Sequence, residues 1–242
     1  MNSGVYAALS GSLVAMRKLD VLANNLANAN TAGFKKDRLT FESLLPPVGT
    51  PSAGRSDAPV LANERLFTDF SPGPQRESGN PLDLALAGDG FFVVETPEGR
   101  RYTRQGNFSR DTAGQLVTAE GYPVRGTGGP LTISGGHIDI NDKGEIRSDG
   151  IPVGTLEIVD FPRPYALEKL GNALFAPADP ELRPQPIKGT AVRQGILEGA
   201  NVEAVTEMIQ LIETNRYFEA CQKVIRSYDD LAAKAANELG RV

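Results

Sequence analysis

The sequence predicts an α+β protein in which long N- and C-terminal helices pair as a coiled coil, with an antiparallel β domain inserted between them. Three observations support this prediction. Both ends carry apolar residues at helical spacing in narrow seams. Residues 80–160 alternate short apolar runs with turn residues, which is typical of short antiparallel strands. The 26 Gly and 17 Pro show no short fixed period and argue against an all-helical chain.

The N-terminal helix is predicted by a seam between residues 5 and 26. The apolar residues that form it are three or four positions apart: Val5, Leu9, Leu13, Met16, Leu19, Leu22 and Leu26. Their mean spacing of about 3.5 residues matches a coiled-coil stripe, which is narrower than the apolar face of a globular helix. An ordinary amphipathic helix packed on its own domain is the alternative, because three heptads are the lower limit for predicting a coiled coil.

The helix is expected to stop within residues 24–35, NNLANANTAGFK. Asn is favoured where helices end because it tolerates a left-handed backbone, and Gly33 adds a second stop signal. Because Leu26 still lies on the seam, residues 30–34 are expected to form the turn itself. Phe34 is then expected to anchor the turn in a packed layer.

The composition changes after residue 45. Residues 46–63 are rich in Pro, Gly, Ser and Ala without a period, and connections of this length are uncommon inside compact domains. The predicted organisation is an N-terminal helix and turn (1–45), an extended connection (46–79), an antiparallel β domain (80–185), and a return segment with a long C-terminal helix (186–242). Residues 1–45 and 195–242 are expected to form one axial coiled-coil core.

Inside the β domain, most segments are predicted to be strands separated by Gly-containing turns. Residues 139–145 resemble the first half of a calcium-binding loop, but its twelfth position is Gly150 where such a loop requires Glu. We therefore predict a β-turn over residues 141–144. Residues 166–170 are expected to form one helical turn.

The C-terminal helix is predicted from Asn201, which is expected to cap it, with Glu203 inside the first turn. Its length is expected to exceed roughly 35 residues, or roughly 55 Å. The seam has steps of three and four: Phe218, Cys221, Ile225, Tyr228, Ala232, Ala235 and Leu239, preceded by Ala204, Met208, Leu211 and Asn215.

Composition argues against several function classes. The net charge of -5 and the pI of about 5.1 do not favour a nucleic-acid surface. Cys221 is the single cysteine, so no internal disulfide is possible, and packing in the helix seam is its expected role. No apolar run is long enough for a transmembrane helix, so no membrane insertion is expected. The start, MNSGVYAALSGSL, lacks the basic region of a cleavable secretory signal, so any export is expected to leave the N-terminus intact.

No catalytic, metal or cofactor site is predicted. His137 is the single histidine, which rules out a His/Cys zinc cluster and leaves one candidate for a Ser-His-Asp triad. An enzyme in the β domain would need polar groups gathered around His137 in a pocket. Arg100, Arg101 and Arg104 have acidic neighbours in the sequence, so a solvated strand face is expected there rather than a phosphate site.

Three parts of the chain resemble the bacterial flagellar basal-body rod protein family, which is related to the hook and hook-associated axial proteins. The N-terminal match is LANNLANANTAGFK at residues 22–35. The C-terminal match is QGILEGANV at 194–202, with Ala200 where the family often has Ser, followed by Met208-Ile209 and RYFE at 216–219. The middle matches at GNPLDLAL (79–86), GFF (90–92) and YTRQGNF (102–108).

Within this family, the chain is more similar to proximal than to distal rod members. Its short length and its GYPV (121–124) and GGP (128–130) segments favour the proximal type. The connection at 46–63 also lacks the Gln-rich segment expected of a distal rod subunit.

The resemblance implies a structural subunit that assembles into the helical drive shaft of the flagellum, crosses the periplasm and transmits torque for motility. It implies that the terminal helices pair in the inner core of a tube while the β domain faces outward. The implied partners are the proximal and distal rod proteins and the flagellar type III export apparatus, which would pass the chain without cleaving a signal. No enzyme activity, cofactor or nucleic acid is implied.

The residues expected at the assembly interface lie on the seams and in the matched motifs. They are Leu9, Leu13, Met16, Leu22, Asn24, Asn25, Leu26, Asn28, Phe34, Asn201, Met208, Phe218, Ile225, Tyr228 and Leu239. The amides of the Asn residues at 24, 25 and 28 are expected to bridge neighbouring subunits.

A β-domain binding module on a dimeric coiled-coil stalk is the alternative function. This alternative predicts a closed dimer in solution. The rod hypothesis predicts a monomer that polymerises on its template.

Overall fold

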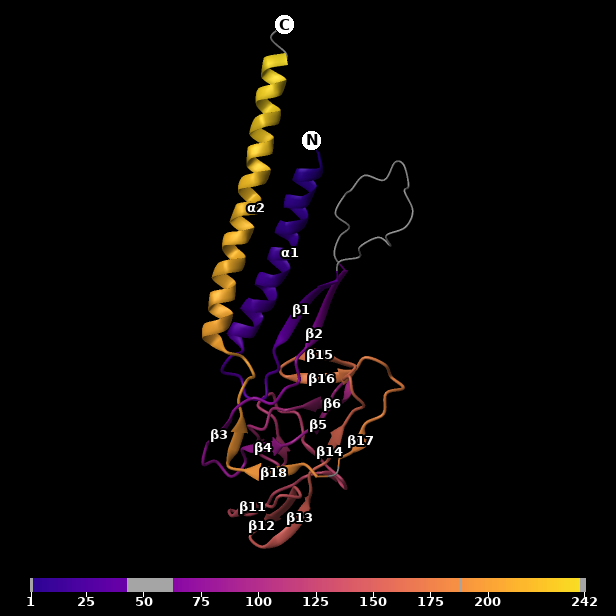
Figure 1. Ribbon diagram of the computed structural model, residues 1–242. Helices are drawn as coiled ribbons and strands as arrows, with labels where there is room; N and C mark the ends of the chain where they lie inside the picture. The colour runs from indigo at the N-terminus through magenta and orange to yellow at the C-terminus, as the bar shows by residue number, and fades with distance from the viewer. Residues whose placement is uncertain (1, 43–62, 188, 240–242) are drawn as a thin grey trace. The chain divides into compact units, whose positions relative to one another are not determined.

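The computed structural model describes residues 2–42, 63–187 and 189–239, and its fold is α+β, as predicted (Figure 1). Internal contacts divide the chain into two units. The terminal unit comprises residues 1–27, 37–69 and 203–242, and the β unit comprises residues 28–36 and 70–202. Of the predicted connection at 46–79, residues 46–62 lie outside the described residues. Residues 63–79 contain two strands, β2 (Asn63–Thr68) and β3 (Gln75–Glu77).

The terminal unit contains both helices. α1 (Asn2–Ala27) and α2 (Ala204–Leu239, 36 residues) contact each other, and β1 (Asp37–Glu42) pairs with β2 as an antiparallel hairpin. Both predicted helices are confirmed, and α2 reaches the expected length. Neither helix, over the residues described, is long and apolar enough to cross a membrane.

The predicted cap of the C-terminal helix is wrong by two residues, because Asn201 does not cap it. The helix begins at Ala204 and is capped by Glu203. The Glu203 carbonyl oxygen accepts a hydrogen bond from the Glu207 amide (3.0 Å), and its carboxylate accepts one from the Thr206 hydroxyl (3.1 Å).

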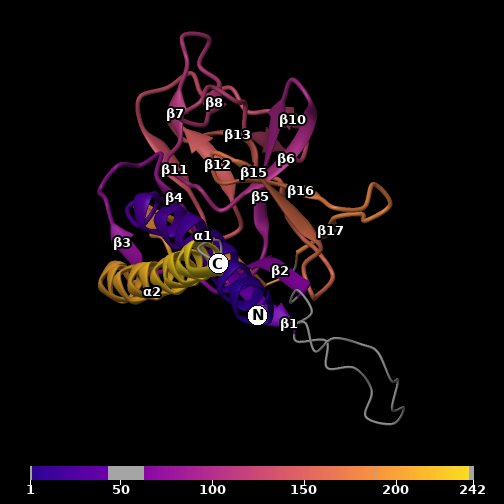
Figure 2. The ribbon, with the colours of Figure 1, turned by 90° about the horizontal axis from the view of Figure 1, so that it is seen from above.

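The β unit contains short strands whose pairings are all antiparallel among the residues described. Its largest sheet has the order β15-β16-β6-β5-β14-β17, and Figure 2 shows β5, β6, β15 and β16 gathered there with β17 at one edge. The bounds in this sheet are β15 Leu167–Gly171, β16 Leu174–Pro177, β6 Gly99–Thr103, β5 Phe91–Thr96, β14 Ile158–Asp160 and β17 Gln185–Pro186.

A smaller sheet joins β11, β12 and β13, and the remaining strands form pairs. The bounds in that sheet are β11 Ile138–Ile140, β12 Glu145–Ser148 and β13 Ile151–Thr155. The pairs are β4 (Leu84–Ala87) with β18 (Ala191–Gln194), β3 with β19 (Ile196–Glu198), β7 (Ser109–Arg110) with β8 (Leu116–Val117), and β9 (Arg125–Gly126) with β10 (Gly129–Pro130).

The core of the β unit lies on both faces of β5. Side chains alternate along a strand, so Phe92 and Val94 enter one buried cluster while Phe91 and Val93 enter another. The second cluster is aromatic, and the Phe91 ring meets that of Phe175 edge-on at 5.8 Å between centroids. The uninterrupted apolar run at 91–94 therefore reflects a strand buried on both faces.

One local prediction in this unit is confirmed and another is wrong. Residues 141–144 form the predicted turn: Asn141 Oδ1 accepts hydrogen bonds from the amides of Lys143 and Glu145 (both 3.0 Å), and Gly144 has φ +77°. The helical turn expected at 166–170 is instead strand β15, which pairs with β16. Five residues suit either structure, and here the long-range pairing decides.

Truncation of a core side chain should destabilise the β unit. Leu116 is fully buried in the first cluster, so Leu116→Ala should cost about 2–5 kcal/mol of unfolding free energy. Ile151→Ala is the control: this side chain is 69% exposed, and its loss should change stability by less than about 0.5 kcal/mol. Urea unfolding followed by circular dichroism measures both. Equal effects of the two substitutions would contradict the assignment of the core.

Candidate assembly site

The motif that follows α1 forms a tight turn within the β unit. The Thr31 amide donates to the Asn28 carbonyl oxygen (3.0 Å), and the Phe34 amide donates to that of Thr31 (3.3 Å). Gly33 has φ +66°, and a Cβ atom there would overlap the backbone of Arg104 and Gln105. Glycine is therefore required at this position, and the predicted helix stop is confirmed.

Residues 33–36 lie along residues 198–201. The Gly33 amide donates to the Glu198 carbonyl oxygen (2.8 Å), and the Asn201 amide donates to that of Phe34 (3.3 Å). The Lys36 amide donates to Asn201 Oδ1 (2.7 Å), while Asn201 Nδ2 donates to the Ser71 carbonyl oxygen (3.1 Å). The Asn201 side chain therefore fastens the turn, which explains why it does not cap α2.

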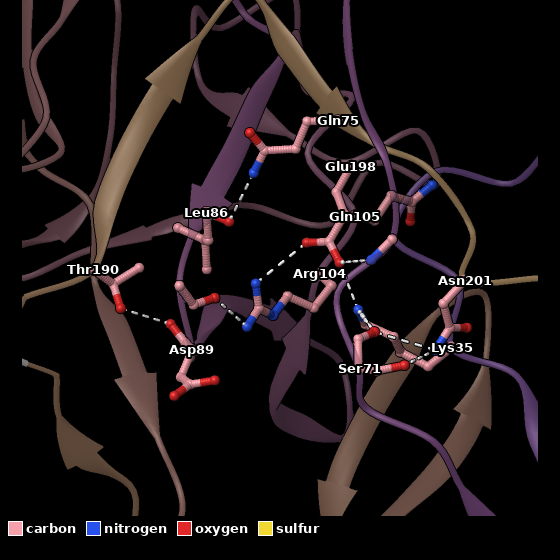
Figure 3. Close-up of polar contacts among 12 residues, drawn as sticks. Lys35, Ser71, Gln75, Leu86, Asp89, Arg104, Gln105, Thr190, Glu198 and Asn201 are labelled. Atoms are coloured by element: carbon pink, nitrogen blue, oxygen red, sulfur yellow. Dashed lines mark hydrogen bonds and ion pairs between the residues drawn. The ribbon is translucent and has the colours of Figure 1, made fainter.

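A buried ion cluster holds the end of the turn (Figure 3). Lys35, which is fully buried, donates to Glu198 Oε1 (2.5 Å) and to the Ser71 carbonyl oxygen (2.8 Å). Arg104 donates to Glu198 Oε2 (3.2 Å) and to the Gly88 carbonyl oxygen (2.7 Å). Figure 3 shows both cationic side chains directed at the Glu198 carboxylate.

The solvated position predicted for Arg104 is wrong, since the side chain is 5% exposed. Its acidic neighbours in sequence suggested a surface, but its partner Glu198 is 94 positions away. Arg100 is exposed as predicted. Arg101 is partly exposed and pairs with Glu98 (3.2 Å).

Phe34 is buried, as its anchoring role requires. The Lys169 ammonium lies 4.0 Å from the centroid of the Phe34 ring and donates to the Lys35 carbonyl oxygen (2.6 Å).

In the terminal unit, α1 presents small residues to α2. Ala8, Ser12 and Ala15 are buried, and Gly11 lies against Tyr217 and Cys221. A Cβ atom on Gly11 would be 2.8 Å from the Tyr217 hydroxyl and 3.2 Å from the Cys221 sulfur. The pKa of Tyr217 is raised above its ordinary value, chiefly by the electrostatic effect of Cys221, then by the hydrogen bond between these two side chains and by burial. Small residues therefore allow the aromatic side chains of α2 to approach α1 closely.

Large apolar side chains on both helices are exposed. On α1, Leu9, Leu13 and Met16 are 47%, 45% and 47% exposed. On α2, Met208, Ile209 and Ile212 are 44%, 53% and 53% exposed. Full burial of such a side chain is favourable by about 1.5–3 kcal/mol, and about half of each remains uncovered on the single chain.

The other predicted interface residues differ in exposure. Leu22 and Asn25 are buried, Asn24 is exposed, and Leu239 belongs to α2, with its side chain outside the described set. The half-buried ones are Leu26, Asn28, Asn201, Phe218, Ile225 and Tyr228.

The buried Asn25 amide joins three elements of the terminal unit. Asn25 Nδ2 donates to the Asp37 carbonyl oxygen (2.9 Å), and Asn25 Oδ1 accepts from the Asp37 amide (2.9 Å). Nδ2 also lies 3.5 Å from Glu207 Oε2. These contacts link the end of α1 to the start of β1 and to the first turn of α2.

Comparisons with known proteins match both ends and the middle of the chain. The model of the flagella basal body rod protein family matches residues 6–35, that of the flagellar hook protein FlgE/F/G D1 domain matches residues 85–150, and that of the flagellar basal body rod FlgEFG protein C-terminal matches residues 193–239. A flagellar basal-body rod protein FlgF from Caulobacter vibrioides is 33% identical over 245 residues, which cover 100% of both chains.

Two further relatives match almost as fully. A FlgG from Bacillus subtilis is 32% identical over 98% of this chain and 99% of its own, and a FlgF from Escherichia coli is 32% identical over 97% of both. The chain belongs to the flagellar basal-body rod protein family. It is similar to FlgF, and the family is structural rather than enzymatic.

A charge at position 25 should disrupt the terminal unit. Asn25→Asp would remove the donor to the Asp37 carbonyl oxygen and place two carboxylates together, at a cost of about 3–5 kcal/mol. Asn24→Asp, at the exposed neighbouring position, is the control. Adding Glu207→Gln to the Asn25→Asp chain should partly restore its stability, since the new amide can donate to the introduced carboxylate. Thermal unfolding measures all three chains, and a stable Asn25→Asp chain would contradict this role.

Proposed function

We propose that this chain is a structural subunit of the flagellar basal-body rod, which self-assembles into the helical drive shaft of the flagellum. The observation that carries this proposal is the kinship with rod proteins over the full length of the chain. The exposed apolar faces of both helices support it, because they provide surfaces that neighbouring subunits can cover.

The two ends of the chain build the axial core of this assembly. Within the predicted end segments 1–45 and 195–242, α1 and α2 pair as a coiled coil, while the turn at 28–36 and strand β19 belong to the β unit. The β domain predicted at 80–185 is inserted between the two helices and faces outward from the axis of the assembly. The contacts between α1 and α2 support this arrangement.

Neighbouring subunits contact one another through different surfaces, which generates an open helix rather than a closed ring. The interface draws on those of the fifteen predicted residues that the single chain leaves exposed or half-buried, whereas Leu22, Asn25 and Phe34 are buried and support it from within. Its apolar part includes Leu9, Leu13, Met16 and Met208, whose exposure on the single chain supports this role. The side chains of Asn24 and Asn28 lie at its edge, while the Asn25 amide is bonded within the chain.

The same kinship supports a proposal about the partners and the location of the chain. The chain assembles with other rod components, both proximal and distal, in the basal body. It reaches the periplasm through the flagellar type III export apparatus without signal cleavage, and it transmits torque from the motor. FlgF and FlgG relatives at similar identity support a place in the rod.

A charge on the exposed helix faces should block assembly without unfolding the chain. Leu13→Asp and Ile212→Asp replace side chains that are 45% and 53% exposed, so the chain should stay folded, with the free energy of unfolding lowered by roughly 0.5–1.5 kcal/mol through lost partial burial and the lower helix propensity of Asp. Cells producing these variants should lose motility, and their isolated basal bodies should contain incomplete rods. Ile151→Asp, on the β unit, is the control and should preserve motility.

Normal motility of both helix variants would contradict this interface. Sedimentation of the purified wild-type chain tests the alternative function. A stable closed dimer would favour a binding module on a dimeric stalk, whereas a monomer favours the rod subunit.

A further inference from the structure

We propose that the β unit carries a preformed receptor for residues 33–36, and that Arg104 prepares this receptor by pairing with Glu198 before Lys35 arrives. The turn would then act as a latch that closes on an already folded surface. This inference concerns the single chain and does not depend on assembly into a rod.

The contacts of residues 33–36 are those of a bound peptide. Backbone hydrogen bonds join this segment to Glu198 and Asn201, as when an extended peptide is added beside a strand. Two of its side chains are recognised separately: the Phe34 ring lies under the Lys169 ammonium, and the Lys35 ammonium meets Glu198. The β unit therefore binds residues 33–36 through both their backbone and their side chains.

The charges make the receptor stable without its segment. Glu198 contacts two cations, Lys35 and Arg104. When Lys35 is withdrawn, Arg104 still compensates the buried carboxylate, and the Gly73 amide still donates to Glu198 Oε1 (3.1 Å). When Glu198 is neutralised, two buried cations lose their common partner, which is far more costly.

Because the receptor residues come late in the chain, residues 33–36 dock late in folding. Lys35 and Glu198 are 163 positions apart, and Glu198 lies on β19, which pairs with β3. In a chain made from its N-terminus, residues 33–36 precede every part of their receptor. Closing so long a loop costs chain entropy, which favours docking after β19 has joined β3.

Hydrogen exchange on the purified full-length chain tests this inference. The amides of Gly33, Lys36 and Asn201 report docking, because each donates across the contact between residues 33–36 and residues 198–201. The amides of Val124 and Ile133, which donate to Leu116 and Gly114, report the core of the β unit.

In Lys35→Met the reporter amides should exchange about 10- to 100-fold faster, since hydrogen bonds to a charged group are lost, while the core amides stay within about twofold. Lys36→Met is the matched control, which removes a neighbouring positive charge and should leave exchange unchanged. In Arg104→Met the reporter amides should exchange faster even though Lys35 is present. In Glu198→Gln both the reporter amides and the core amides should exchange faster.

Several results would overturn the proposal. If the reporter amides of Lys35→Met exchanged at the wild-type rate, Lys35 would not fasten the turn. If the reporter amides and the core amides exchanged faster by the same factor in Lys35→Met, Lys35 would be an ordinary core residue. If the reporter amides of Arg104→Met exchanged at the wild-type rate, Arg104 would have no preparatory role. If Glu198→Gln accelerated exchange less than Lys35→Met does, the charge argument would be refuted.

A second variant covers the case in which Glu198→Gln does not fold. The combined Lys35→Met and Glu198→Gln chain buries one cation instead of two, so recovery of a folded core in it supports the proposal. Failure of the combined chain to recover overturns it.

Discussion

The carboxylate of Glu198 is the group on which the organisation of the β unit depends. It is buried with two cations, and its own backbone carbonyl accepts from the Gly33 amide. A buried charge is stable only when it is compensated and hydrogen-bonded. Arg104 and the Gly73 amide meet this requirement around Glu198, and Lys35 completes the cluster when the turn docks. These residues come from the N-terminal turn, from the segment before β3 and from the position directly after β6, so distant parts of the chain meet at Glu198.

The terminal unit follows a different principle. Its two helices meet through small residues on α1, while larger apolar side chains such as Leu13 and Ile212 remain exposed. A chain that needed only to be stable alone would bury its largest apolar groups first. The observed distribution leaves that apolar area uncovered on the single chain and limits what the isolated helix pair gains from burial.

The sequence was sufficient to predict both helices, the β middle and the turn at Gly33, because these depend on local periodicity and on backbone preferences. It did not predict the environment of Arg104 or of Asn201, whose partners are far away in the chain. Lys35, Arg104 and Glu198 each stood inside one of the matched motifs, which was the available signal, but sequence alone did not show that the three meet. Strand β15 was missed because its pairing with β16, rather than its composition, determines its structure.

The exposure of an ion pair decides how it responds to dissolved salt. The Arg38–Asp69 pair of the terminal unit (2.8 Å) has an Arg38 side chain that is 53% exposed, so mobile ions can surround it and weaken it. The Lys35–Glu198 pair is enclosed, with side chains 0% and 1% exposed, and counterions cannot approach it. The attachment of the turn is therefore much less sensitive to the ionic strength around the molecule than the exposed Arg38–Asp69 pair.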